Sequence, residues 1–316
     1  MKFSVALCTY NGEKYLHQQI SSILNQSVKV DEILICDDIS TDKTMAILND
    51  FRAKNSDIIK IYSNSENLRS VKNFEKAIKL CTGDIIFLAD QDDVWAETKV
   101  EEFKTLFQDE NTKGIFSDGF LIDKNNDVIH STSLWNSFNF NPKILSSNLE
   151  LSKYLTQKNN IATGATMAFR KEIVNEITPF PELNNFHHDQ WIALYLALNN
   201  NLNYIDKKLI SYRIHENQQV GAKLKSNVFK KFKNSIIDQV IFKNQAPPLL
   251  THKKITKLLQ QNIKLLKYLF KVSENEKFRK LASNTISNLE ARQNYYNERV
   301  SILNDFKILT TKLLKY

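Results

Sequence analysis

Apolar and polar positions alternate along the first third of the chain in a way that predicts strands and helices in turn. Apolar runs predict buried strands over residues 3–8, 32–36, 58–62 and 84–89. Between them, apolar residues recur at helical spacing over residues 13–25, 42–54 and 71–80. A strand–helix series of this kind predicts a mainly parallel sheet with helices on both faces, which is an α/β fold.

The pattern is less regular after Asp90 and becomes entirely helical near the C-terminus. Helices are predicted over residues 97–108 and from His188 onward. Strands are predicted over residues 114–122, 165–169, 203–205 and 209–213, with a variable loop over 124–145. From about residue 223 only helical spacing remains, with one apolar stripe among lysines. We therefore predict a domain over 1–221, with halves 1–95 and 96–221, and an all-helical basic region over 222–316.

Charge is distributed unevenly over the 316 residues, whose formal net charge is +8. Residues 207–316 hold 23 Lys and Arg against 7 Asp and Glu, whereas residues 1–206 hold 20 against 28. Basic amphipathic helices favour either an anionic membrane surface or a protein contact, such as a helical cap or a homodimer interface. The sequence has no zinc-finger or RNA-binding aromatic motif, which argues against a nucleic-acid partner.

Cysteine use and hydropathy bear on the compartment. Cys8, Cys36 and Cys81 are widely spaced and odd in number, which predicts reduced core thiols rather than disulfides or a zinc site. A strand-like run begins at Phe3, so we expect no signal peptide. No apolar run approaches the ~18 residues that span a bilayer. These features predict a cytoplasmic protein, either free or peripheral on the inner face of the cell membrane.

Three of the predicted strands run directly into polar or acidic loops. They end in Thr9-Tyr10-Asn11-Gly12-Glu13, in Asp37-Asp38-Ile39-Ser40-Thr41-Asp42 and in Asp90-Gln91-Asp92-Asp93. Ligands bind at the carboxyl ends of the strands in open α/β sheets. Closely spaced carboxylates suit Mg²⁺ or Mn²⁺ bound together with a substrate diphosphate. The alternative is a solvated acidic turn that caps the next helix.

These loops, taken in order, carry a family resemblance. Gly83-Asp84 precedes the fourth strand, and Asp90-Gln91-Asp92-Asp93-Val94-Trp95 follows it. Further on come His188-Asp189-Gln190-Trp191 and Tyr212-Arg213-Ile214-His215. In this combination the sequence resembles family 2 glycosyltransferases with the GT-A fold, especially the bacterial branch that builds surface polysaccharides and includes rhamnosyltransferases. The resemblance covers roughly residues 2–221.

The resemblance implies a nucleotide-sugar donor held at the strand ends, with a divalent cation, Mn²⁺ or Mg²⁺, on its diphosphate. Asp92 and His215 would bind the metal, and Asp37 or Asp38 would read the base. The expected donor-binding residues are Thr9, Asn11, Glu13, Asp37, Asp38, Arg69, Asp90, Gln91 and Arg213. Family members commonly have glycine at positions 39 and 69. Because a non-glycine residue is strained at positive φ, Ile39 predicts a rearranged turn.

The resemblance also implies that Asp189 is the general base, which takes the proton of the acceptor hydroxyl as that oxygen attacks the anomeric carbon. One base and one metal suffice for a single displacement with inversion. The acceptor would be a glycan or a lipid-linked glycan. The alternative for Asp189 is a helix N-cap, and the alternative for Arg69 and His215 is a plain surface position. His187 and His188 have no expected role.

Two other classes of protein fit parts of the pattern. A nucleotidyltransferase that makes a nucleotide-sugar would also use an α/β sheet and carboxylate-bound Mg²⁺. Its first loop is normally glycine-rich and basic, whereas Thr9–Glu13 is acidic. A non-catalytic membrane-associated scaffold would need neither Asp92 nor Asp189. The metal-dependent inverting glycosyltransferase accounts for the most motifs, so it is the function that the sequence predicts.

Overall fold

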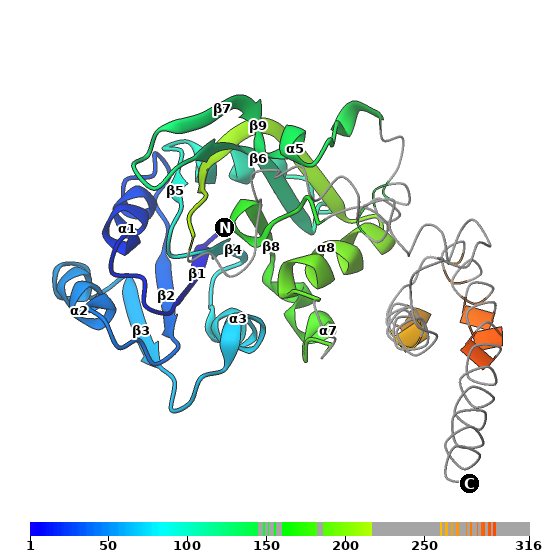
Figure 1. Ribbon diagram of the computed structural model, residues 1–316, viewed down its shortest axis with the longest axis horizontal. Coiled ribbons are helices and arrows are strands. Elements are labelled where there is room, and N and C mark those ends of the chain that lie inside the picture. Colours follow the sequence, from blue (N-terminus) through cyan, green and yellow to red (C-terminus); the bar gives the residue numbers. More distant parts are fainter. Residues whose placement is uncertain are drawn as a thin grey trace, which may run out of the picture. The chain divides into compact units, whose positions relative to one another are not determined.

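A nine-stranded mixed sheet runs through the described part of the chain (Figure 1). The computed structural model describes residues 1–144, 160–181 and 186–216, three positions between 148 and 155, and scattered positions between 260 and 294. The strand order is β3-β2-β1-β4-β8-β6-β9-β5, with β7 paired to β6. The strands are β1 Phe3–Thr9, β2 Glu32–Asp37, β3 Ile59–Ser63, β4 Ile85–Ala89, β5 Val94–Trp95, β6 Gly114–Ile122, β7 Val128–Ser133, β8 Met167–Arg170 and β9 Leu202–Arg213.

The strands β1 to β4 are parallel, as the sequence predicted. β1 pairs with β2 and with β4, and β2 pairs with β3. In this register Thr9 lies opposite Asp37, and Leu7 lies opposite Ala89. The carboxyl ends of β1, β2 and β4 therefore meet at one edge of the sheet. Beyond β4 the sheet is mixed, because β8 is antiparallel to both of its neighbours, β4 and β6.

Helices lie on both sides of the parallel strands, which confirms the predicted α/β arrangement. Figure 1 shows α1 and α2 on one side of strands β1 to β3 and α3 on the other. Helix α3 packs against β1 and β2, and α8 packs against α3. The α-helices are α1 Leu16–Leu24, α2 Thr44–Lys54, α3 Arg69–Leu80, α4 Lys99–Leu106, α5 Leu134–Ser137, α7 Val174–Ile177 and α8 His188–Leu198. Short 3-10 helices are η1 Pro142–Ile144, η2 Gly164–Thr166 and η3 Lys171–Ile173.

The core lies on the strands that the apolar runs predicted. Every residue of β2 and β4 is buried, as expected for strands with neighbours on both edges and helices on both faces. Helix α3 buries Phe74, Ala77 and Ile78, whose i, i+3 and i+4 spacing defines one helical face. Cys8, Cys36 and Cys81 are free thiols; Cys36 and Cys81 are buried, as predicted, whereas Cys8 is only partly buried.

Two local predictions were wrong. The loop predicted over 124–145 contains β7, α5 and η1, because a turn closed by the Asp127 carbonyl and the Asp123 N–H leads β7 back onto β6. The two short strands predicted over 203–205 and 209–213 form the single strand β9. It follows β6 through two register shifts, which interrupt the apolar pattern without ending the strand.

The chain separates into two units, one formed by residues 1–181 and 186–224 and the other by residues 182–185 and 225–316. The first unit holds every strand of the described sheet. In the second unit, the described positions between 260 and 294 are helical, and Ile263 is buried. Most of the predicted helical region lies outside the described residues, so the domain boundaries stay a prediction. Among the residues that the structure describes, no helix is long and apolar enough to cross a membrane.

Glu32, the first residue of β2, joins three strands at the amino-terminal edge of the sheet. Its buried carboxylate accepts hydrogen bonds from the Ser4 hydroxyl at 2.6 Å, from the Thr82 N–H, and from Lys60 at 3.0 Å. Burial alone would raise the pKa of Glu32, but these donors outweigh it and lower the pKa to about 2. The ionised carboxylate therefore stabilises the fold.

Replacing Glu32 by Gln should lower the stability at neutral pH and change its dependence on pH. The folded-state pKa of about 2 lies below the unfolded value of about 4.3. The stabilisation from Glu32 is therefore complete above the unfolded pKa and is lost as the pH falls toward the folded one. Urea unfolding of wild type and E32Q from acid to neutral pH should show a flatter acid limb for E32Q. If the stability of the two proteins fell in parallel toward acid pH, the stabilising role of the ionised Glu32 would be contradicted.

Candidate active site

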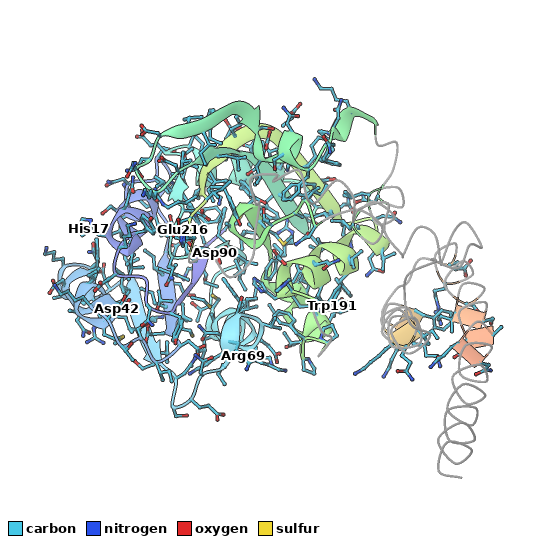
Figure 2. All side chains as sticks on the ribbon, in the orientation of Figure 1. His17, Asp42, Arg69, Asp90, Trp191 and Glu216 are labelled. Carbon is cyan, nitrogen blue, oxygen red and sulfur yellow. The ribbon has the colours of Figure 1, made fainter. Side chains whose placement is uncertain are left out.

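The loops after β1 and β4 are joined at the carboxyl edge of the parallel strands. The Gln91 side chain accepts a hydrogen bond from the Tyr10 N–H at 2.8 Å and donates one to the Tyr10 carbonyl at 3.0 Å. Gln91 thus pairs with Tyr10 as a neighbouring strand would. Asp90, labelled in Figure 2, begins the second of these loops. Gln91, predicted to bind the donor, holds the two loops in register.

The loops after β1 and β2 are joined by two of the predicted donor-binding residues. Asn11 Oδ1 accepts the Thr41 N–H at 2.8 Å, and Glu13 Oε2 accepts the Lys43 N–H at 2.9 Å. A further hydrogen bond joins the same two loops in the opposite direction: Asp42 Oδ2 accepts the Glu13 N–H at 3.1 Å. Asn11 and Glu13 therefore lie at the sheet edge where they were expected, with side-chain oxygens that bind protein N–H groups.

Asp37 and Asp38 are buried, and protein donors surround both carboxylates. Asp37 Oδ1 accepts the Thr9 hydroxyl at 2.8 Å, and its Oδ2 accepts the Ser40 N–H at 2.9 Å. Asp38 accepts two backbone N–H groups, from Leu68 at 2.8 Å and from Arg69 at 2.9 Å. The exposed fractions are only 1% and 3%. These carboxylates therefore shape the loops around the expected base site, and their predicted contact with the base stays a prediction.

Ile39 and Arg69 adopt the left-handed backbone conformation at the two positions where glycine was expected. Their φ angles are 58° and 60°. The prediction of a rearranged turn at Ile39 was therefore wrong. Asp37 accepts the Ser40 N–H and Asp38 accepts the Arg69 N–H, so hydrogen bonds hold both loops against the steric cost of a Cβ at positive φ. The Arg69 side chain is exposed at the start of α3 (Figure 2).

Asp90 lies among other carboxylates. Burial raises its pKa, and the charges of Asp92 and Asp189 act in the same direction, so that the pKa reaches about 8. Asp189 comes from α8, almost a hundred residues further along the chain. The loop after β4 and the start of α8 therefore face the same space. This brings the predicted metal-binding and base residues together.

The two residues predicted to bind the metal are in direct contact. The distance between Asp92 Oδ2 and His215 Nε2 is 2.8 Å, and both side chains are mostly buried. Among the described residues, no group of three or more His, Cys, Asp or Glu side chains is arranged to hold a metal ion. The pair nevertheless fits a cation that takes few protein ligands and completes its shell with water and substrate phosphate oxygens, as Mg²⁺ usually does.

Arg213 lies beneath the acidic loop and is fully buried. Its guanidinium donates to the Asp92 carbonyl at 2.7 Å, to the Asp123 carbonyl at 2.9 Å and to Gln18 at 3.0 Å. Its backbone N–H donates to Asp93 Oδ1 at 2.9 Å. Arg213 thus fixes the backbone that carries Asp92. A contact with diphosphate oxygens, which the sequence predicted, would require these bonds to be exchanged.

Asp189 is the second residue of α8, and a turn of the chain before β8 orients it. Its Oδ2 accepts the Gly164 N–H at 2.9 Å, and its Oδ1 accepts the Gln190 N–H at 2.7 Å. The N-cap of α8 is His187, which makes no side-chain cap. The alternative considered for Asp189, a helix N-cap, is therefore wrong. Its carboxylate is anchored on one oxygen to η2.

His188 and Trp191 are core residues on the same helix. The His188 ring stacks on Phe74, with ring centroids 4.0 Å apart. Burial lowers the pKa of His188 to about 4, although the charge of Asp189 opposes this, so the imidazole is neutral. Trp191 is fully buried and donates its ring N–H to the Ile177 carbonyl at 2.8 Å. Both ring nitrogens of His188 are buried without a hydrogen-bond partner among the described residues.

Lys99 is a buried lysine to which the sequence gave no role. It begins α4 and donates to the Ala165 carbonyl at 2.6 Å. Lys99 and Phe103 are four residues apart on α4, which is the spacing of one helical face, and both are buried. This spacing could have indicated that Lys99 faces the core. A lysine on such a face, however, normally extends its ammonium to solvent.

Comparison with known proteins identifies the family. The profile of Glycosyl transferase family 2 matches residues 4–178, which is more than half of the chain. The chain therefore belongs to glycosyltransferase family 2. It is 26% identical to an uncharacterized glycosyltransferase of Nostoc, over 68% of this chain and 65% of that protein. It is 29% identical to the dTDP-rhamnosyl transferase RfbG of Shigella flexneri, over 69% and 74%.

A further similar protein has a name that states its sugar donor and its acceptor. The Escherichia coli protein WfaP, a UDP-Glc:alpha-D-GlcNAc-diphosphoundecaprenol beta-1,3-glucosyltransferase, is 37% identical over 31% of this chain and 38% of its own length. The chain thus spans less than two thirds of the Nostoc relative and a smaller part of WfaP.

Solved structures share the fold. Staphylococcus aureus TarS 1-349, in complex with UDP-GlcNAc, has a TM-score of 0.58 at 16% identity and covers 94% of this chain and 92% of that one. The mannosyltransferase PcManGT from Pyrobaculum calidifontis, in complex with GDP-Man and Mn²⁺, has a TM-score of 0.50 at 14% identity, over 93% and 71%. At these identities the likeness concerns the fold alone, and it confirms the predicted GT-A-like α/β fold.

Replacing Ile39 by glycine should stabilise the protein by about 0.5–1 kcal/mol, because the cost of a Cβ at positive φ exceeds the entropy that glycine adds to the unfolded chain. Ile39 is 41% exposed, so little packing is lost. Chemical denaturation measures the difference. Asn200→Gly is the matched control, because asparagine tolerates its φ of 60° and should gain less. An I39G protein no more stable than wild type would contradict the strain at this turn.

Proposed function

We propose that the protein transfers a sugar from a nucleoside diphosphate donor to an acceptor hydroxyl, with inversion at the anomeric carbon. The observation that carries this proposal is the gathering of Asp90, Asp92 and Asp189 at one edge of the sheet. Family membership supports glycosyl transfer. The likeness in fold to proteins solved with UDP-GlcNAc and with GDP-Man supports a nucleotide-sugar donor. Both rival classes, a nucleotidyltransferase and a scaffold, are disfavoured by the family.

Asp92 and His215 are the residues that would hold a divalent cation, Mn²⁺ or Mg²⁺. Carboxylate oxygen and imidazole nitrogen are both acceptable ligands of Mn²⁺. Burial and the neighbouring carboxylates raise the pKa of Asp90 and of Asp93, and a cation at this point would favour their ionised forms. A bound cation of this kind offsets the charge that builds on the departing diphosphate. PcManGT, which shares the fold, was solved with Mn²⁺.

Asp189 is the proposed general base. As the acceptor oxygen bonds to the anomeric carbon, its proton passes to the Asp189 carboxylate. The bond between that carbon and the diphosphate oxygen breaks, and its electron pair leaves with the nucleoside diphosphate. One displacement of this kind inverts the anomeric carbon. The Gly164 N–H holds Oδ2 and fixes the direction in which the carboxylate accepts the proton.

The donor would lie against the loops after β1, β2 and β4. Asn11, Glu13 and Gln91 tie these loops together through hydrogen bonds to backbone groups. Loops held by such bonds need less ordering when a ligand binds. We therefore assign to these residues both a lining and a shaping role toward the nucleoside.

A glycan or lipid-linked glycan is the proposed acceptor. The name of WfaP gives that relative an acceptor on diphosphoundecaprenol. A basic region toward the C-terminus would suit an acceptor at an anionic membrane surface. The contact of that region with membrane or with a second copy, and the location at the inner face of the membrane, fall on residues outside those described and stay predictions.

Asp92→Asn should abolish the metal dependence of donor binding and weaken binding in the presence of Mn²⁺ by at least about 100-fold. Calorimetry with UDP-glucose, UDP-N-acetylglucosamine, GDP-mannose and dTDP-rhamnose, each with and without Mn²⁺, measures this. Asp57→Asn is the control, because Asp57 is an exposed aspartate away from this edge. Unchanged Mn²⁺-dependent binding by D92N would remove Asp92 from the metal site.

Asp189→Asn should keep donor binding within about threefold and lower the turnover of the bound donor by about 100-fold or more, because the carboxylate acts on the proton rather than on the nucleotide. Release of nucleoside diphosphate from the donor selected by calorimetry measures turnover, with water as acceptor where no sugar acceptor is supplied. If D189N turned over donor at near wild-type rates, the base would have to be another group.

A further inference from the structure

Lys99 has an environment that is unusual for a lysine. The side chain is fully buried, and its ammonium donates a hydrogen bond of 2.6 Å to the Ala165 carbonyl. The ammonium also lies over two aromatic rings, 4.0 Å from the centre of Trp95 and 5.9 Å from the centre of Phe103. Ring faces attract a cation, but they do not replace the water that it has lost.

Packing alone does not account for an ammonium at this position. Burial lowers the pKa of Lys99 to about 7, although the charges of Asp93 and Asp90 act in the opposite direction. A methionine of similar length would fill the same space without the cost of removing a charge from water. The ammonium is therefore best explained by its hydrogen bond to the Ala165 carbonyl and by the charges of Asp93 and Asp90 near it.

Ala165 belongs to the turn that orients the proposed base. It is the middle residue of η2, Gly164–Thr166. The residue before it, Gly164, donates its N–H to Asp189 Oδ2 at 2.9 Å. The bond from Lys99 and the bond to Asp189 therefore involve adjacent residues of one short turn. We infer that a shift of the Ala165 carbonyl would disturb this short turn and with it the N–H that holds Asp189.

We propose that Lys99 is a positioning residue for the transfer reaction, which acts on Asp189 through the η2 turn. The proposal rests on the proposed function of Asp189 as general base. The buried ammonium fixes the Ala165 carbonyl, and the fixed turn presents the Gly164 N–H to the carboxylate. Without the ammonium, the turn gains freedom and Asp189 loses its fixed direction. Small displacements of a reacting group slow the chemical step strongly.

The test compares Lys99→Met and Lys99→Gln with two controls. Methionine keeps the length of the side chain and removes the donor, whereas glutamine keeps a donor without the charge. Phe103→Leu is the matched control for packing, because Phe103 is buried on the same helix. Lys207→Met removes an exposed lysine that pairs with Glu102 at 2.6 Å. All variants are made in the full chain.

Two readouts separate positioning from general destabilisation. The first is hydrogen exchange of the backbone amides of Gly164 and Thr166, which does not depend on activity. The second is kcat and KM for donor turnover, measured below the unfolding temperature of each variant. We expect K99M to speed exchange at both amides and to lower kcat, each by at least about tenfold, while KM for the donor stays within about threefold. For K99Q, the exchange rates and kcat should lie between those of K99M and wild type.

The controls define the outcomes that overturn the proposal. F103L should speed exchange along α4 without singling out Gly164 and Thr166, and K207M should behave as wild type. Exchange at these amides no faster in K99M than in F103L would overturn the proposal, as would a parallel change in kcat and KM. If neither Lys99 variant folds, Lys99 serves the whole fold and the proposal is wrong. A wild-type protein without turnover would overturn the proposed function, while the exchange readout would still test Lys99.

Discussion

The repulsion between carboxylates at one edge of the sheet is the constraint around which the rest of the structure is arranged. The acidic loop after β4 and Asp189 of α8 bring several negative charges into one space, and the raised pKa of Asp90 records the cost. Two buried cations, Lys99 and Arg213, lie next to this loop. The charge of Lys99 and the hydrogen bond from the Arg213 N–H both oppose the rise in the pKa of Asp93. The proposed divalent cation would offset the remaining negative charge when the donor binds.

Backbone strain and buried hydrogen bonds are the means by which the other loops are shaped. Ile39 and Arg69 adopt positive φ, and the buried carboxylates of Asp37 and Asp38 hold the neighbouring N–H groups. Such conformations persist where the surroundings determine them strongly, and they concentrate at functional sites. The same loops are tied to each other through Asn11. Their shape therefore depends on hydrogen bonds within the protein.

The parallel half of the fold and the place of the site follow from the sequence because they depend on short-range patterns. Apolar runs and helical spacing locate β1 to β4 and their helices, and the polar residues after each strand must meet at one edge. The contact of Asp92 with His215 depends instead on the path of β9, which local periodicity predicted as two strands. The family resemblance, rather than spacing, supplied this pair.

The side chains that support the site were the least predictable. The sequence predicted that Arg213 binds phosphate, yet its N–H groups donate to the backbone carbonyls of Asp92 and Asp123. Lys99 reads as one polar residue on an amphipathic helix, yet it bonds to Ala165 in a distant segment. Which acceptor a long basic side chain reaches is set by tertiary packing, and single-sequence patterns do not contain that information. The supporting roles of Arg213 and Lys99 were identified only from their burial and their hydrogen-bond distances in the structure.

The most direct test of the account is calorimetric titration of the folded protein with Mn²⁺, alone and together with UDP, GDP or dTDP. The account predicts weak binding of Mn²⁺ alone to the Asp92–His215 pair, and at least about tenfold tighter binding when a nucleoside diphosphate supplies the remaining ligands. Absence of Mn²⁺ binding under all these conditions, or nucleotide binding that is indifferent to the cation, would contradict it.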